Sequence, residues 1–227
     1  GTAFWLGTDH LGRDLYTRLL YGAQNTVSIA LVITFLSFIL GVTAGFTAAT
    51  LGGWVDHLFS RIVDILMAFP TLIFALVILS VLGTSIPVLI VVIALLDSTR
   101  VYRLSRAVAM DVEVMEYVEV ARLRGEGLWW LMRHEILPNA LSPLVAEMGL
   151  RFIFAVLFVS TLSFLGLGVQ PPEADWGGIV KENKDGIVYG IPAALAPAFA
   201  IATLAISVNL VADWVLNRTT SLKGGRG

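Results

Sequence analysis

The chain has 227 residues, of which 57% are hydrophobic and only 14% charged, and its formal net charge is −2. Its mean hydropathy is +0.83, and a soluble domain usually carries about 25% charged residues, so an ordinary soluble domain is excluded. The net charge says little about partners, and no nucleic-acid partner is expected. The absence of cysteine excludes disulfides and thiolate metal sites.

Long uncharged stretches predict membrane-spanning helices. Charged residues are absent inside four windows, which run from Arg18 to Asp56, from Asp64 to Asp97, from Arg151 to Glu173 and from Asp185 to Asp213. Each window is long enough, because a helix needs about 20 apolar residues to cross a bilayer core. The sequence therefore predicts an all-α polytopic membrane protein with five spans, at about 25–50, 59–82, 87–107, 141–168 and 191–216.

Glycine and proline mark the connections between the predicted spans. Gly52 and Gly53 indicate a tight turn, Pro70 a kink in the second span, and "GTSIP" at 83–87 another turn. Pro171 and Pro172 end the fourth span, and a polar loop follows at 173–190. The expected organisation is a loop and amphipathic segment at 1–24, a transmembrane domain at 25–216 and a tail at 217–227.

The distribution of lysine and arginine predicts the orientation. If the polar segment 108–138 is cytoplasmic, the inner side collects ten basic residues: Arg61, Arg100, Arg103, Arg106, Arg122, Arg124, Arg133, Arg218, Lys223 and Arg226. The outer side collects four, namely Arg13, Arg18, Lys181 and Lys184. The excess of positive charge inside fixes the orientation, with the C-terminus in the cytoplasm and 1–24 and 173–190 outside. Five spans leave the N-terminus outside, which suggests an earlier span upstream of Gly1.

The cytoplasmic segment reads as two short helices joined at a glycine corner. Residues 113–122 are good helix formers, Gly125 and Gly127 break the helix, and "LWWLMRHEIL" starts a second one that runs to Pro138. Three large apolar side chains would then be displayed on the aqueous face: Leu128, Trp129 and Leu131. Exposed apolar patches usually mark a partner site, but tryptophans also gather in the headgroup belt. The residues alone leave both readings open.

Three charged residues inside the spans are candidates for the translocation path: Asp97, Glu147 and Arg151. Glu147 and Arg151 are four residues apart and can pair on one helix face, so a neutralised pair that ties spans together is the alternative. Asp97 either bonds to Arg100 one turn later or faces the path. Such charges would also serve a self-sufficient secondary transporter or channel, which remains the alternative function.

No catalytic motif is apparent. His134-Glu135 lacks the second histidine of a zinc-protease motif, and no Gly-x-x-x-x-Gly-Lys-Ser/Thr phosphate loop is present. The chain is therefore expected to be a non-catalytic transport subunit that binds no cofactor or metal.

Several motifs resemble one family. The pattern Glu119-x-Ala121, Gly125, then Ile136-Leu137-Pro138 is similar to the "EAA" loop of permease subunits in binding-protein-dependent ABC importers. Other stretches resemble the di/oligopeptide and nickel permease branch, in chain order "LGTDHLGRDLYTRLLYGAQ" (6–24), "DILMAFPTLIFALVI" (64–78), "RHEILPNALSPL" (133–144), "SFLGLGVQPPEADWG" (163–177) and "NLVADW" (209–214). Val120 and Glu135 depart from the usual residue types of the loop.

The resemblance implies a type I ABC importer permease fold in a bacterial or archaeal cytoplasmic membrane, with a sixth span upstream of this chain. It implies four kinds of partner: the lipid bilayer, a second homologous permease, two cytoplasmic ATPases that hold ATP and Mg, and an extracytoplasmic solute-binding protein. The residues expected to couple to the ATPases are Glu119, Ala121, Arg122, Gly125, Leu128, Trp129, Leu131, Leu137 and Pro138. Peptides, nickel chelates and glutathione-like compounds all remain possible solutes.

The outer loop "GVQPPEADWGGIVKENKDG" is the expected contact of the binding protein, through exposed Asp175 and Trp176. The alternative is a locally closed loop in which aspartate caps a helix, as it commonly does.

Overall fold

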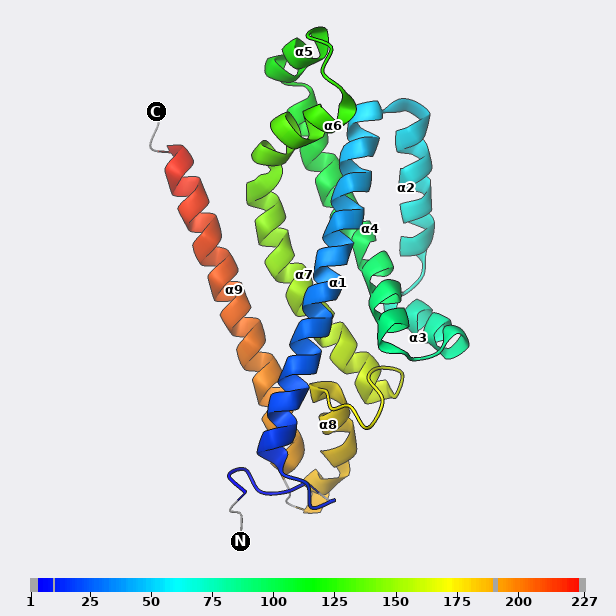
Figure 1. The fold of residues 1–227 in the computed structure, drawn as a ribbon, viewed down its shortest axis with the longest axis vertical. Coiled ribbons are helices and arrows are strands. Elements are labelled where there is room, and N and C mark those ends of the chain that lie inside the picture. Colours follow the sequence, from blue (N-terminus) through cyan, green and yellow to red (C-terminus); the bar gives the residue numbers. More distant parts are fainter. Residues whose placement is uncertain (1–3, 10, 190–191, 225–227) are drawn as a thin grey trace. The chain divides into compact units, whose positions relative to one another are not determined.

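The computed structural model describes residues 4–9, 11–189 and 192–224, which form helices and turns with a single isolated bridge between Thr8 and Asp14. The expectation of an all-α protein is confirmed. The helices in chain order are α1 Leu15–Leu51, α2 Gly53–Ala68, α3 Thr71–Leu82, α4 Ile86–Glu113, α5 Glu116–Leu123, α6 Leu128–Leu131, the π-helical turn η1 Met132–Ile136, α7 Leu137–Leu165, α8 Trp176–Asn183, the 3₁₀ turns η2 Lys184–Tyr189 and η3 Pro192–Ala194, and α9 Leu195–Gly224 (Figure 1).

Each predicted span corresponds to a helix or a pair of helices. Among the described residues, three continuous stretches are long and apolar enough to cross a membrane: Leu15–Leu51, Leu128–Leu165 and Pro192–Val215. The pair α2 and α3 passes the same test together but is bent at a short break. That break falls at Phe69 and Pro70, where a kink is predicted. The predicted third span lies within α4, whose 28 residues are long enough to cross, although α4 is not among the helices that are both long and apolar enough.

Two predicted helix ends are wrong. The amphipathic helix expected before residue 24 is not separate, because α1 starts at Leu15 and no proline interrupts it before Leu51. Pro138 does not end the helix that contains it. The chain passes from α6 through η1 into α7 without a gap, so Pro138 lies in the first turn of α7. Proline has no N–H to donate and its ring crowds the carbonyl four residues back, and the wider π turn just before it accommodates both.

The chain divides into two compact units, and α1, α4, α7 and α9 contribute to both. The first unit comprises residues 1–33, 72–93 and 152–210. Its apolar core joins the start of α1 to α8 through Leu15, Trp176 and Ile179. Gly22 of α1 leaves room for this packing, since a Cβ there would lie 3.0 Å from Ile179 Cδ1 and 3.1 Å from Trp176 Cδ1.

The second unit comprises residues 34–71, 94–151 and 211–227. Here α1 and α4 approach closely at Gly41 and Gly45, which are four residues apart on one face of α1. A Cβ on Gly41 would lie 2.6 Å from Val101 Cβ, and one on Gly45 2.9 Å from Tyr102 O. Small residues at this spacing allow the backbones of membrane helices to touch.

Candidate functional site

The loop between α4 and α7, which the sequence predicts to be cytoplasmic, has the predicted corner. Helix α5 ends at Leu123, and Gly125 follows with a φ of 83°. This left-handed conformation is open to glycine but costs other residues energy because of their Cβ. The chain then turns into α6 at Leu128.

One face of the loop is built into the core of the second unit. Val118 and Ala121 of α5 have no exposed surface, and they share a cluster with Phe46 of α1, Val101 of α4 and Ile136 of η1. The loop is therefore packed onto the ends of the helices that it connects.

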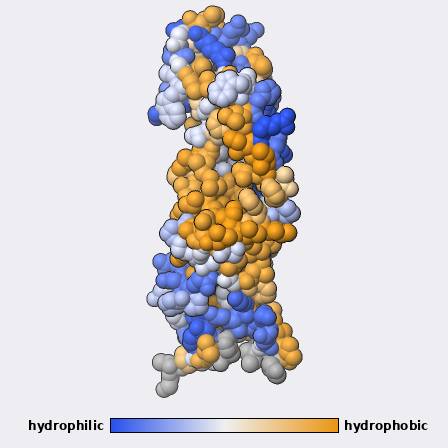
Figure 2. Space-filling model, turned by 90° about the vertical axis from the view of Figure 1, so that its right-hand side faces the viewer, coloured by the Kyte–Doolittle hydropathy of each residue, from blue (hydrophilic) through white to orange (hydrophobic). Residues whose placement is uncertain are grey.

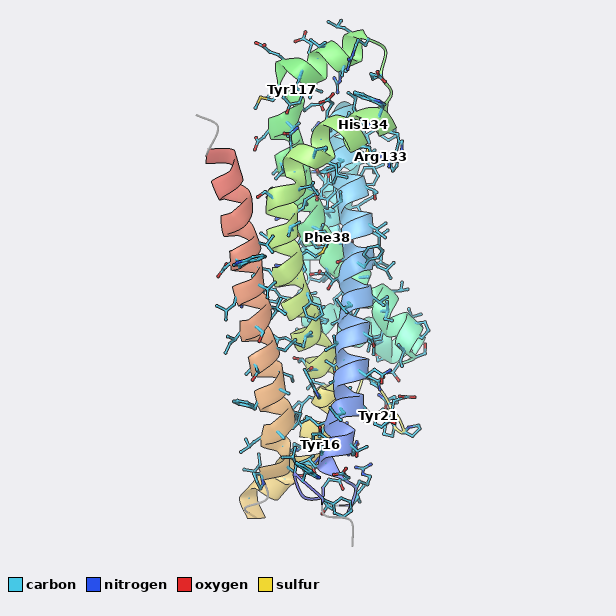
Figure 3. The ribbon with its side chains drawn as sticks, turned by 60° about the vertical axis from the view of Figure 1, so that its left-hand side comes forward. Tyr16, Tyr21, Phe38, Tyr117, Arg133 and His134 are labelled. Carbon is cyan, nitrogen blue, oxygen red and sulfur yellow. The ribbon has the colours of Figure 1, made fainter. Side chains whose placement is uncertain are left out.

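The opposite face displays apolar side chains. Leu123 is 82% exposed and Trp129 is 67% exposed, with Val120 and Tyr117 also exposed. Tyr117 projects from α5 in Figure 3. The sequence prediction of Trp129 as a displayed residue is confirmed, but Tyr117, Val120 and Leu123 were missed. Their spacing of three residues, offset from buried Val118 and Ala121, is the signal that separates the two faces.

Some residues predicted to be displayed are not. Leu131 is only 3% exposed and belongs to the buried cluster. Ala121, which the sequence assigns to coupling but not to the displayed group, is fully buried. Leu128 and Leu137 are partly buried against the same cluster. The reason is local: α6 is a single turn, so Leu131 and Trp129 point in different directions although they are two residues apart.

The charged residues of the loop also divide into one that is bonded within the chain and one that is exposed. Arg122 is paired within the chain, through an ion pair with Glu113 and a 3.0 Å hydrogen bond from Nη2 to the carbonyl oxygen of Thr50. It ties α5 to the ends of α4 and α1. Glu119, by contrast, is exposed and has no ion-pair partner among the described residues.

An aromatic and basic group completes the loop. Trp130 stacks on His134 with 4.8 Å between ring centroids, and the guanidinium of Arg124 lies 5.6 Å from the Trp130 ring centroid. His134 Nδ1 also lies 3.2 Å from the carbonyl oxygen of Trp130. Arg133 projects from η1 beside His134 (Figure 3). Of the adjacent tryptophans, Trp130 thus supports the loop while Trp129 is presented.

The three charges predicted for the path lie together. Arg151 Nε contacts Glu147 Oε1 at 2.7 Å, the predicted pair, and Arg151 Nη1 contacts Asp97 Oδ1 at 3.3 Å. Arg100 lies 3.9 Å from the same carboxylate. Asp97 and Arg151 are both buried, so this group joins α4 to α7 inside the second unit.

In the loop between α7 and α8, which the sequence predicts to be outside, the two residues expected to contact a binding protein are buried. Asp175 is 1% exposed and Trp176 is 6% exposed. Asp175 caps α8 by accepting hydrogen bonds from the backbone N–H groups of Gly177 and Gly178 at 3.1 and 3.2 Å. Trp176 donates its backbone N–H to Thr26 Oγ1 and its indole Nε1–H to Leu19 O, both at 3.1 Å. The alternative of a closed, capped loop is the one observed.

The closed packing of this loop changes the pKa values of its buried carboxyl groups. Burial raises the pKa of Asp175 to about 6, despite the hydrogen bonds that favour its charged form. Asp9 lies in a second closed group, where Arg13 and Arg18 each contact both Asp9 and Glu182. Burial alone would raise the pKa values of Asp9 and Glu182, but the bonds from the two arginines hold both below their ordinary values.

Comparison with known proteins agrees with these observations. The family described as binding-protein-dependent transport system inner membrane component matches residues 39–221. A putative peptide transport system permease protein of Brucella suis is 39% identical over 213 residues, which cover 94% of this chain and 72% of that protein. A dipeptide transport system permease protein of Alkalihalophilus pseudofirmus is 34% identical over 92% of this chain and 69% of its own length.

Solved structures support the fold. The inward-facing MetNI methionine ABC transporter matches with a TM-score of 0.73 at 18% identity, covering 89% of this chain and 96% of that chain. At this identity the match concerns the fold alone, and it confirms the predicted architecture of an ABC importer permease.

The chain belongs to the family of binding-protein-dependent transport system inner membrane components. It is a translocation subunit of an ATP-driven importer, a multi-pass inner membrane protein that works with other subunits. The permease itself is a non-catalytic component. This membership decides against a self-sufficient secondary transporter or channel.

Proposed function

We propose that the chain forms half of a translocation path for peptides or a related small solute. The names of the relatives support this solute class, since they include permease proteins for peptides, dipeptides and glutathione. In this proposal a second homologous permease completes the path and a solute-binding protein delivers the solute from outside. Two cytoplasmic ATPases hold ATP and Mg and hydrolyse the ATP. The C-terminus and the loop 108–138 then lie in the cytoplasm, as the positive-inside bias indicates.

The observation that carries the coupling role is the two-faced character of the loop. The exposed side chains of Leu123 and Trp129 offer an apolar docking surface to the ATPases, with Glu119 beside them. Behind this surface, Val118, Ala121 and Leu131 are packed into one cluster with the ends of α1, α4 and α7. A movement of the docked ATPase would pass to the helices through rigid packing, as in other transitions between bistable states.

The buried charged group has a different role in this proposal. Asp97, Glu147 and Arg151 form an ion-pair tie that keeps α4 and α7 together during that movement. Burial of Asp97 and Arg151 supports the tie, because a buried charge is stable only when it is paired. Binding-protein contacts, in turn, fall to outer residues other than Asp175 and Trp176.

The test combines capture and transport. The chain is purified in detergent with its co-expressed partners, and the importer is reconstituted in liposomes with its binding protein. We expect both ATPases to co-purify and trialanine to accumulate only with ATP. The double variant Gly125→Pro with Trp129→Ala should lose the ATPases, since proline does not adopt the positive φ of residue 125. Uptake without ATPases would refute the coupling role.

A further inference from the structure

The second unit contains a cavity that neither the family nor the coupling role accounts for. It lies between α2 and α4, which run side by side (Figure 1), and has a volume of about 410 Å³. This is within the usual range of small-molecule sites. Its wall includes seven polar or charged side chains: Asp56, His57, Ser60, Asp64, Tyr102, Arg103 and Arg106.

Part of this wall is fixed by its own contacts. Arg106 binds the carboxylate of Asp56 through two nitrogens, with Nη2 2.5 Å from Oδ2 and Nε on Oδ1. The hydroxyl groups of Ser60 and Tyr102 are hydrogen-bonded at 2.9 Å. These contacts cross from α2 to α4 and hold the two helices at a constant distance, so the cavity is preformed.

The other charged pair has bonding capacity left. Asp64 and Arg103 share one hydrogen bond, from Nη2 to Oδ1 at 2.8 Å. A guanidinium has five N–H donors and a carboxylate accepts at both oxygens. The side chains are also accessible, Asp64 being 49% and Arg103 54% exposed. A ligand with a positive and a negative group can therefore bind both Asp64 and Arg103 without displacing the pair of Asp56 and Arg106.

The surroundings of the pair make a purely structural surface bridge a poor explanation. Ile62 and Ile65 are exposed apolar residues on other sides of α2, whereas Arg61 and Ser60 share the helix face of Asp64. Apolar side chains also cover much of the middle of the face that carries α2 (Figure 2). Asp64 lies eleven residues from the start of α2, about 17 Å along the helix axis. The predicted orientation places Asp64 and Arg103 toward the inner ends of their helices, and ionisable groups in such helices face water-filled cavities or protein.

The charges of the wall indicate the ligand. Two carboxylates face two guanidinium groups, so the aspartates and arginines together carry no net charge. Such a wall gives no advantage to a simple anion or cation, but it binds an ammonium and a carboxylate on one molecule. We propose that this cavity is a solute site of the translocation path for a zwitterion, with Asp64 holding the ammonium and Arg103 the carboxylate. This inference rests on the proposed function, and it assigns the solute chemistry to named residues.

The chain has no cysteine, so Ser60→Cys places one thiol of this subunit in the cavity. In the reconstituted importer, with any reactive cysteines of the partners removed, we expect a charged methanethiosulfonate reagent to label it. Ile65→Cys is the matched control on the apolar surface of the same helix and should react only with a membrane-soluble maleimide. If Ser60→Cys resists the charged reagent, the cavity is not aqueous and the proposal is wrong.

The second arm tests the ligand. Trialanine should slow the labelling of Ser60→Cys at least fivefold, while N-acetylated and C-amidated trialanine should protect much less. This comparison needs no change at Asp64 or Arg103, so it does not depend on whether variants fold. Asp64→Asn should then abolish the preference for a free amino group, and Arg103→Gln the preference for a free carboxylate.

Equal labelling with all three peptides, in an importer that retains its ATPases and ATP-driven uptake, would overturn the solute site but leave the proposed function standing. Loss of ATP-driven uptake in the unaltered importer would instead refute the proposed function, and the solute site with it.

Discussion

In the predicted outer loop, between α7 and α8, Asp175 and Trp176 are turned inward and bonded to α8 and α1. In the predicted cytoplasmic loop, between α4 and α7, Leu123 and Trp129 are exposed. Both loops are polar stretches between apolar helices, and both carry tryptophan. The difference lies in what each loop packs against. The outer loop uses its distinctive side chains to close itself, while the cytoplasmic loop uses small and aliphatic ones for packing and leaves its largest apolar groups free. A motif residue can thus be structural in one loop and available for docking in the other.

The largest effect is expected for Trp176→Ala. It removes a buried indole from the core of the first unit together with the hydrogen bond from Nε1–H to Leu19 O, and truncating a buried tryptophan costs about 3–5 kcal/mol. Thermal unfolding in detergent should show a large loss of stability. Trp54→Ala is the control, since Trp54 is exposed. Equal unfolding temperatures for the two variants would mean that the outer loop is not closed by this residue.

The next effect concerns the cytoplasmic loop. Trp129→Ala should leave the unfolding temperature nearly unchanged but weaken ATPase capture by at least about tenfold, as expected for an aromatic hot spot. Leu131→Ala is the matched variant on the buried face. It should mainly lower the unfolding temperature, because it leaves a cavity that costs about 2–5 kcal/mol. Identical behaviour of the two variants would remove the distinction between the displayed and the buried face.

Gly125→Ala should have a smaller effect. The left-handed backbone at this position costs a residue with a Cβ about 1–2 kcal/mol, which strains the corner between α5 and α6. We expect a modest drop in stability and weaker ATPase capture. Gly127→Ala is the control, since Gly127 has a φ of −79° and open space where a Cβ would go. An effect of equal size at residue 127 would show that loop flexibility, and not the bend, matters.

The smallest effect is a pH dependence of the outer loop. The pKa of Asp175 is raised by burial from 3.8 to about 6, so the folded state holds the proton more tightly than the unfolded state does. The resulting stability is fully present below about pH 3.8 and is lost as the pH rises through about 6. The unfolding temperature should therefore rise by a few degrees when the pH falls from 7 to 5.

Asp175→Asn serves as the control for this titration. Asparagine remains a good helix N-cap and carries no charge to bury, so the variant should be at least as stable as the unaltered protein at pH 7. Its unfolding temperature should also change less between pH 7 and 5. A pH response of unchanged size in this variant would assign the titration to another group.

Much of the fold is predictable because a bilayer imposes a strong pattern. Uncharged windows identify the membrane helices, Pro70 marks the break between α2 and α3, and Gly125 marks the corner of the cytoplasmic loop. Each of these signals is local: it depends on hydropathy, on proline chemistry or on the freedom of glycine. The pairing of Glu147 with Arg151 is local too, since the two lie one helical turn apart.

The contacts that were missed join residues far apart in the chain. Asp97 pairs with Arg151, Asp56 with Arg106, and Trp176 with Thr26. No spacing rule predicts such partners, and they decide which side chains are buried. Asp175 is hidden because α8 folds back on α1, and Arg122 is occupied because the end of α1 lies within its reach. Individual site residues were therefore less predictable than the segment that carries them.

In the proposed function, Trp129 contacts an ATPase while its neighbours anchor the loop. The most direct measurement is cross-linking from Trp129→Cys to cysteines introduced around the expected groove of the co-expressed ATPases, with Leu131→Cys as the matched control. We predict a cross-linked product for residue 129 that changes in yield when ATP is added, and none for residue 131. A cross-link from both positions, or from neither in a complex that still holds its ATPases, would contradict the account.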